Sequence, residues 1–79
     1  MIGYYSMKGG DKMDMNLLKY HMGNHGDRQS DLAKALGFSA SALSSRMHGK
    51  TDFRKNEIEV IRDRYHLSAI DLQAIFFAS

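Results

Sequence analysis

Apolar residues recur at helical spacing soon after the start of the chain. Met15, Leu18 and Met22 fall on one face of a helix, because residues three or four apart lie on the same side. Asp14 stands directly before them and is a typical N-cap residue. The pattern predicts a first helix from this cap to about Met22, where the glycine-containing stretch 23–26 interrupts it.

A second, shorter helix is predicted over 29–36. Leu32 and Leu36 lie one turn apart, with the small residue Ala33 beside the first of them. Gly37 follows at the place where helices commonly end with a left-handed residue. Two short helices that cross closely need a small side chain at the contact and a glycine at the corner. We therefore expect a sharp turn into another helix here.

The third predicted helix covers 40–48, with Ser39 as its N-cap and Gly49 at its end. Leu43 and Met47 lie one turn apart and are expected to face the core. At about 100° per residue the opposite face is polar, and it carries Ser41, Ser44, Ser45 and His48. The sequence thus predicts a surface helix with one buried face and one face open to a partner.

Two further helices complete the pattern. In 57–65, Ile58 and Ile61 begin an apolar stripe. Ser68 and Asp71 have the spacing of a capping box and open a last helix. Its apolar residues are Ile70, Leu72, Ile75, Phe76 and Phe77. Proline is absent and strand signals are sparse, so the sequence predicts an all-α fold class with five short helices.

The adjacent phenylalanines near the C-terminus suggest a contact between subunits. On a helix, Phe76 and Phe77 point about 100° apart, so both cannot face the same core. With Ile70, Leu72 and Ile75 available for the interior, one ring remains for a partner or for water. We therefore expect a homodimer whose interface comes from Ile75, Phe76 and Phe77.

Size and composition limit the possible classes of protein. A chain of 79 residues is enough for one small domain, and without cysteine it has no disulfide or thiolate metal site to stabilise it. No apolar run approaches the ~18 residues of a membrane span, and 1–12 lacks the apolar stretch of a secretion signal. We expect a cytoplasmic protein with no membrane partner, in which 1–12 is a flexible arm and 13–79 is the folded domain.

Charge is unevenly distributed along the chain. The net charge is only +2, but between Asp27 and Lys55 six basic residues stand against three acidic ones. After Lys55, two arginines stand against four acidic residues. A basic middle segment suits an anionic partner such as nucleic acid.

Metal and catalytic chemistry have little support in the sequence. His21 and His25 are four apart, but glycines interrupt the helix near them, and His48 and His66 lie in other segments. We expect no metal site and no cofactor. The serines of the third helix have no positioned base or orienting acid nearby, and a cap and a polar face explain their spacing. We expect neither enzymatic activity nor a small-molecule substrate.

The segment 29–50 resembles the helix-turn-helix of the lambda-repressor-like family, which includes the Cro and repressor proteins of phages. The matching residues are Gln29, Leu32-Ala33, Leu36-Gly37, Ser39, Leu43 and Gly49-Lys50. The later part of the chain resembles the small repressors of Gram-positive phages at Phe53, Glu57-Ile58 and Ile75-Phe76-Phe77. The resemblance covers about 16–77. It implies a helical DNA-binding domain whose third helix enters the major groove.

The resemblance also implies roles for individual residues. The base-contacting positions of the family correspond to Ala40, Ser41 and Ser45. We expect Ser44 on the same face and Arg46 at its edge. The family's phosphate-contacting positions include Gln29 and Lys50, and we expect further backbone contacts from His48, Arg54 and Lys55.

Three departures from the family pattern affect this assignment. Asp27 stands where the family usually has an apolar residue, and Arg46 stands near a position that is often leucine. The serines replace the amide and guanidinium side chains that make bidentate base contacts. Specificity could then depend on Arg46, on thymine methyl groups or on DNA shape.

Together these features predict a sequence-specific transcriptional regulator, a phage or prophage repressor or Cro-like protein, that binds a double-stranded DNA operator as a homodimer. The alternative is a protein-interaction module on the same fold, such as an antitoxin-like partner-binding domain, because fold does not fix function. Retention on random DNA at low salt, lost steeply as salt rises, distinguishes the two.

Overall fold

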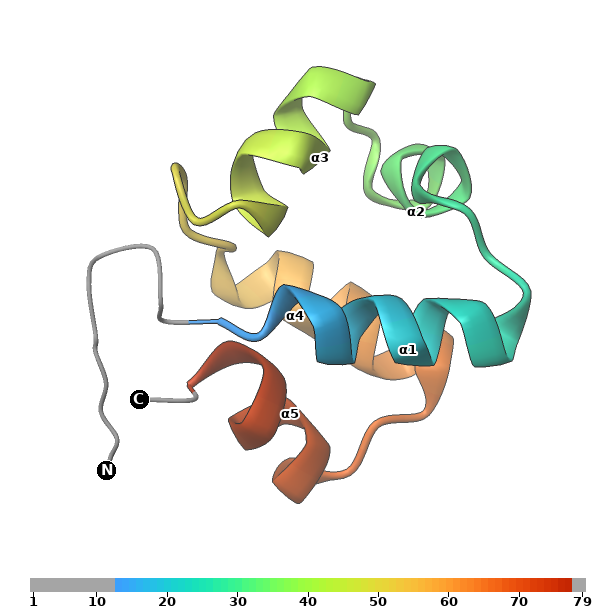
Figure 1. The fold of residues 1–79 in the computed structure, drawn as a ribbon, viewed down its shortest axis with the longest axis vertical. Helices are drawn as coiled ribbons and strands as arrows, with labels where there is room; N and C mark the ends of the chain where they lie inside the picture. The colour runs from blue at the N-terminus through green and yellow to red at the C-terminus, as the bar shows by residue number, and fades with distance from the viewer. Residues whose placement is uncertain (1–12, 78–79) are drawn as a thin grey trace.

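The computed structural model describes residues 13–77, which form five helices and no strand (Figure 1). The helices are α1 (Met15–His25), α2 (Gln29–Leu36), α3 (Ala40–Met47), α4 (Lys55–Tyr65) and α5 (Ala69–Phe76). The prediction of an all-α fold with five short helices is confirmed. The arm expected over 1–12 lies outside the described residues. Within 13–77 no helix has the length and apolar content that crossing a membrane demands.

Two predicted helix boundaries need correction. The first helix does not stop at Met22 but continues through Gly23 to His25. It ends at Gly26, whose φ of 82° is left-handed and whose N–H bonds back to the helix. The fourth helix begins at Lys55 rather than Glu57, because the Glu57 carboxylate accepts the Arg54 backbone N–H at 2.8 Å and caps the helix start.

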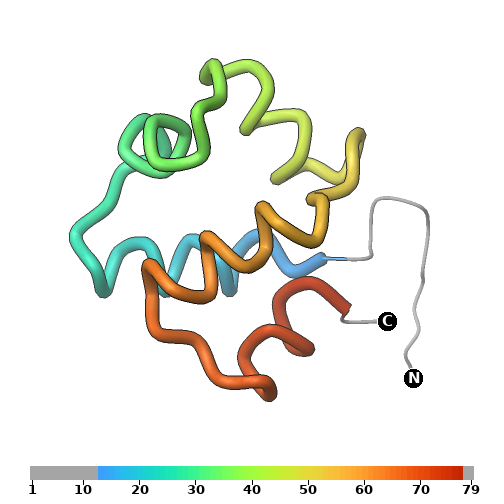
Figure 2. Tube along the Cα trace, turned by 180° about the vertical axis from the view of Figure 1, so that it is seen from behind, coloured from blue at the N-terminus to red at the C-terminus, as the bar shows by residue number. Residues whose placement is uncertain are grey.

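The core is shared by all five helices. Leu18, Leu32, Leu43, Ile61 and Ile75, one from each helix, have no exposed surface. Burying a side chain of this size contributes roughly 1.5–3 kcal/mol. Helix α2 packs against α3 and α4, and helix α1 packs against α4 and α5. In Figures 1 and 2, α1 and α4 lie between the α2–α3 pair and α5.

The apolar residues of α5 and the residue after it are not buried and exposed in the way that the sequence predicted. Ile75 and Phe76 belong to the core, and the Phe76 ring meets the Phe53 ring edge-on with centroids 5.5 Å apart. Within one subunit these two side chains leave little surface for the dimer contact expected of them. Phe77 is 61% exposed, and Ile70, expected inside, is 80% exposed. The reason is geometric, since Ile70 lies about 140° around the helix from Ile75 but only about 20° from Phe77.

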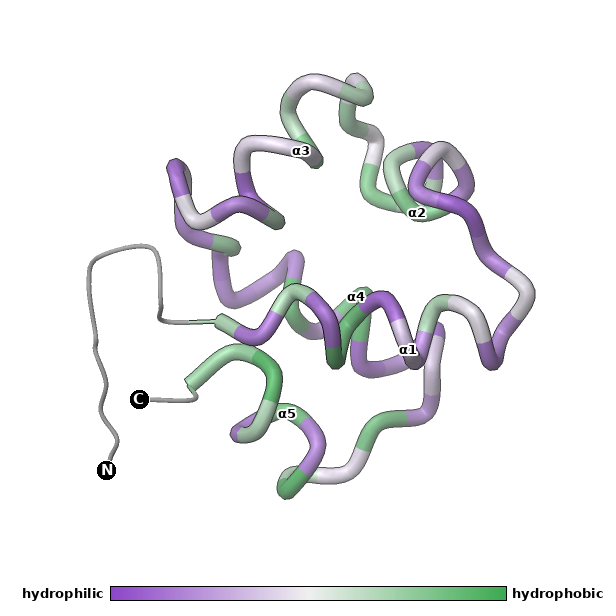
Figure 3. Tube along the Cα trace, in the orientation of Figure 1, coloured by the Kyte–Doolittle hydropathy of each residue, from purple (hydrophilic) through white to green (hydrophobic). Residues whose placement is uncertain are grey.

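This arrangement leaves an apolar stripe on the outside of the molecule. Helix α5 is coloured as largely apolar along its trace (Figure 3), although only part of it faces the interior. Its inner side is held against the start of α1, where the Asp14 N–H donates to the Ile75 carbonyl at 2.6 Å. Its outer side presents Ile70, and Phe77, the residue directly after the helix, is exposed as well.

Candidate functional site

Helices α2 and α3 are joined by a short, well-defined turn. The Phe38 N–H donates to the Ala33 carbonyl at 2.8 Å and closes the end of α2. The Ser39 hydroxyl accepts the Ala42 N–H at 3.1 Å, so it caps α3 as the sequence predicted. Leu43 and Met47 are buried, as expected, and this fixes which side of α3 faces outward.

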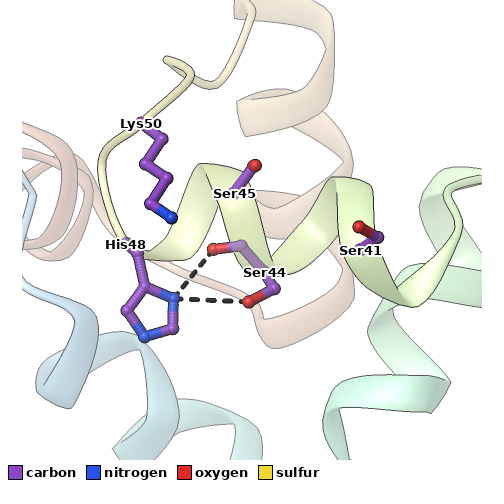
Figure 4. Close-up of a pocket in the computed structure, with 5 residues that line it drawn as sticks. All are labelled: Ser41, Ser44, Ser45, His48 and Lys50. Carbon is purple, nitrogen blue, oxygen red and sulfur yellow. Dashed lines mark hydrogen bonds between the residues drawn. The ribbon is translucent and has the colours of Figure 1, made fainter.

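The outward side of α3 contains a shallow hollow of about 210 Å³. Its lining residues are Ser41, Ser44, Ser45, His48 and Lys50 (Figure 4). The structure thus brings together three of the predicted base-contacting residues and two of the predicted phosphate-contacting residues. The hollow offers three hydroxyl groups, an imidazole and an ammonium, a set of groups suited to a polar and anionic partner.

Lys50 lies at this hollow because the chain folds back onto the last turn of α3. Gly49 has a φ of 80°, a left-handed conformation that glycine adopts without strain. The Lys50 and Thr51 N–H groups then both donate to the Ser45 carbonyl, at 2.9 and 3.3 Å. The backbone that carries the ammonium group is therefore anchored to the helix beside it.

His48 is the exposed C-cap residue of α3, and its ring is oriented by the helix itself. Nδ1 lies 2.9 Å from the Ser44 carbonyl oxygen and 3.4 Å from the Ser44 hydroxyl. Figure 4 shows both contacts, with the other ring nitrogen pointing away from Ser44. The imidazole is thus held at the edge of the hollow by its own helix.

Arg46 is not presented alongside the serines. Its Nε and Nη2 donate to the two carboxylate oxygens of Glu57 at 3.0 and 3.4 Å, and Nη1 donates to the Ala42 carbonyl at 3.4 Å. Its guanidinium also stacks over the Phe38 ring, 4.2 Å from the centroid. The side chain is only 15% exposed, so its polar atoms are directed toward α4 and the turn rather than the hollow.

Glu57 is the buried partner in this arrangement. Burial opposes its charge, but the Arg54 N–H and the Arg46 guanidinium hold the pKa of its carboxyl below the ordinary value. The carboxylate therefore links α3 to the start of α4.

The predicted contact residues Arg54 and Lys55 are exposed at the start of α4, outside the lining of the hollow.

The two remaining predicted contact residues also lie at helix starts. Gln29 is the first residue of α2 and Ala40 the first residue of α3, and both are exposed. Backbone N–H groups at a helix start favour anionic partners. Neither residue lines the hollow. A candidate site that includes both of them therefore extends from the hollow to the N-termini of α2 and α3.

A second polar cluster was missed by the sequence analysis. The Asp27 carboxylate, 7% exposed, accepts bonds from Arg64 at 2.5 and 2.9 Å and from the Tyr65 hydroxyl at 2.7 Å. The Arg64 hydrogen bond lowers the pKa of Asp27 to about 2, against the effect of burial. Burial in turn raises the pKa of Tyr65. The signal available in the sequence was Asp27 itself, an acidic residue where the resemblance noted in the sequence analysis implies an apolar one.

Metal-ligating side chains do not gather in the part of the chain from 13 to 77, where no group of three or more His, Cys, Asp or Glu residues could hold an ion. Comparisons of this chain with models of protein families, with curated proteins and with solved structures gave no match.

Proposed function

We propose that the protein is a sequence-specific DNA-binding regulator of transcription of the helix-turn-helix kind, a repressor or Cro-like protein, with α3 as its recognition helix. The observation that carries this proposal is the hollow on the outer side of α3, where three serine hydroxyls, His48 and Lys50 lie together. The major groove of DNA is about 12 Å wide and admits one helix. The site of action would be the bacterial nucleoid in the cytoplasm.

The residues divide between contacts to bases and contacts to the phosphate backbone. The exposed face of α3 presents Ala40, Ser41, Ser44 and Ser45 to base edges. Lys50 and the residues at helix starts, Gln29, Arg54 and Lys55, hold the sugar–phosphate backbone on either side. Arg46 supports the recognition helix from behind through Glu57 and Phe38.

The exposed stripe of α5 supports assembly as a homodimer. Ile70 and Phe77 lie on one side of the helix and are largely exposed. Two such side chains cover only part of the ~800 Å² per subunit that a stable interface buries, so the dimer would be weak in solution and firm on DNA. Two copies related by a two-fold axis would contact half-sites about 34 Å apart.

The test is selection of bound sequences from a random pool of double-stranded DNA. We expect enrichment of one motif with two-fold symmetry, and binding that weakens steeply as salt rises. A protein that passes through heparin and random DNA unretained at low salt would contradict the proposal.

One observation favours a second candidate, a protein-interaction module on the same fold. Arg46, the long side chain best suited to bidentate base contacts on α3, is engaged with Glu57. An antitoxin-like domain would use the exposed apolar stripe for a protein partner and would show no retention on DNA.

A further inference from the structure

The orientation of His48 carries a consequence for which bases the protein prefers. Nδ1 of His48 lies 2.9 Å from the Ser44 carbonyl oxygen. A carbonyl oxygen only accepts hydrogen bonds, so this contact is a hydrogen bond in the tautomer that carries the proton on Nδ1. In the neutral ring, Nε2 then has a lone pair and no proton, and it accepts hydrogen bonds rather than donating them.

This state of the ring determines which DNA groups His48 can bind. Phosphate oxygens are acceptors, so the neutral ring has no hydrogen to offer them. In the major groove the hydrogen-bond donors are the exocyclic amines, N6 of adenine and N4 of cytosine. An exposed acceptor beside the recognition helix is therefore complementary to these two bases and not to guanine O6 or N7.

We propose, on the basis of the proposed DNA-binding function, that His48 is a specificity-determining residue whose Nε2 accepts a hydrogen bond from the exocyclic amine of an adenine or cytosine. This replaces the backbone role predicted for His48 from the sequence. The serine hydroxyls beside it donate and accept equally well, so they discriminate little between bases. Lys50 at the same hollow only donates hydrogen bonds, so Nε2 of His48 is the group there that only accepts them.

The premise is tested in the protein without DNA. The ¹⁵N chemical shifts of the imidazole nitrogens distinguish a protonated from an unprotonated nitrogen. At pH 8, where histidine side chains are ordinarily neutral, we expect Nδ1 of His48 to be the protonated nitrogen. A spectrum with the proton on Nε2 would overturn the proposal.

The consequence is tested by sequence selection with His48 variants whose folding is checked by thermal melting. His48→Asn retains an amide that can donate to the Ser44 carbonyl but has no atom at the Nε2 position. We expect it to lose about fivefold discrimination at one base pair of each half-site, with the other positions unchanged. His48→Arg offers only donors, and we expect guanine to replace adenine or cytosine at that base pair.

His66→Asn is the matched control. His66 is exposed at the end of α4 with a left-handed φ of 54°, which asparagine tolerates, and the change should leave every base preference intact. An equal loss of affinity of His48→Asn for all sequences would identify a backbone contact, and no effect would identify a plain surface residue. Either result overturns the inference while DNA binding stands. Absence of DNA binding by the unmodified protein would instead remove the proposed function and this inference together.

Discussion

At the scale of single residues, the two cations near α3 have different roles because their surroundings differ. The Lys50 ammonium lies at an open hollow on a backbone anchored by Ser45. The Arg46 guanidinium is stacked on Phe38 and paired with buried Glu57. The sequence analysis predicted a DNA contact for both residues, because a sequence shows which side chains are charged but not which side chains they pair with.

Lys50→Ala should weaken binding to all DNA sequences to a similar degree. Removing one cation that neutralises a phosphate lowers the slope of log affinity against log salt by roughly one unit. Binding isotherms at several salt concentrations measure this slope. Lys34→Ala, at an exposed position outside the lining of the hollow, is the control and should retain the original slope. A change confined to sequence preference would contradict the backbone role of Lys50.

Arg46→Met should destabilise the fold by about 3 kcal/mol, because it leaves the buried Glu57 carboxylate without its ion-pair partner. Denaturant unfolding measures the loss. Adding Glu57→Gln to this variant should recover part of it, since the uncompensated charge is then removed. Arg62→Met, which removes an exposed pair with Asp63, should leave the melting curve nearly unchanged. Altered base preference in a folded Arg46→Met protein would show that Arg46 contacts DNA after all.

At the scale of elements, the side chains on the outer face of α3 can be replaced while those on its inner face stay buried. The combined change of Ser41, Ser44 and Ser45 to alanine should alter the preferred bases at a cost of about 1 kcal/mol per lost contact. Stability should not fall, because alanine is the best helix former and Leu43 remains buried. Selection from random DNA and thermal melting check both parts. Ser30→Ala, on the exposed side of α2, should affect neither, and an unchanged motif in the triple variant would argue for shape recognition.

The elements themselves were largely predictable from short-range signals. Three pairs of apolar residues at helical spacing, together with Ser39 as a cap, predicted helices that the structure contains: Leu32 and Leu36, Leu43 and Met47, and Ile58 and Ile61. The inner side of α5 was not predictable, because Ile70 and Ile75 are equally apolar and only the packing of α5 on α1 decides which of them is buried. Long-range partners were likewise invisible, as with Asp27 and Arg64, which are 37 residues apart.

At the scale of the whole molecule, the Asp27 cluster joins the connection between α1 and α2 to the end of α4. The Arg64 hydrogen bond lowers the pKa of this carboxyl from its ordinary value of 3.8 to about 2 in the folded protein. Because the folded pKa is depressed, its contribution is complete above pH ~4 and is lost as pH falls toward 2. The size of this contribution is about 2 kcal/mol.

Asp27→Asn should therefore lower the free energy of unfolding at neutral pH and flatten its decline between pH 4 and pH 2. Denaturant unfolding at a series of pH values gives both quantities. Asp63→Asn, which changes a more exposed carboxylate on α4, is the control and should keep the steep decline. If Asp27→Asn left the acid dependence intact, other carboxylates would have to account for it.

The proposed homodimer is also tested at the scale of the whole molecule. Replacing both Ile70 and Phe77 by serine should shift sedimentation toward the monomer and weaken binding to a two-fold operator more than to one half-site. Folding should persist, since these side chains are 80% and 61% exposed. Tyr20→Ser, at a 62% exposed residue on α1, is the control. A native protein that is monomeric on DNA and binds an isolated half-site equally well would exclude the dimer.

The hydrogen bond from the Asp14 N–H to the Ile75 carbonyl makes it possible to measure the separation of α5 from α1 by hydrogen exchange. Amide protons at the start of a helix have no partner within the helix and ordinarily exchange quickly with solvent deuterium. The Asp14 proton is instead held by the last turn of α5, so it exchanges only when the two ends of the fold separate. Its exchange rate measures how often α5 lifts from α1, and a second subunit seated on Phe77 would slow it.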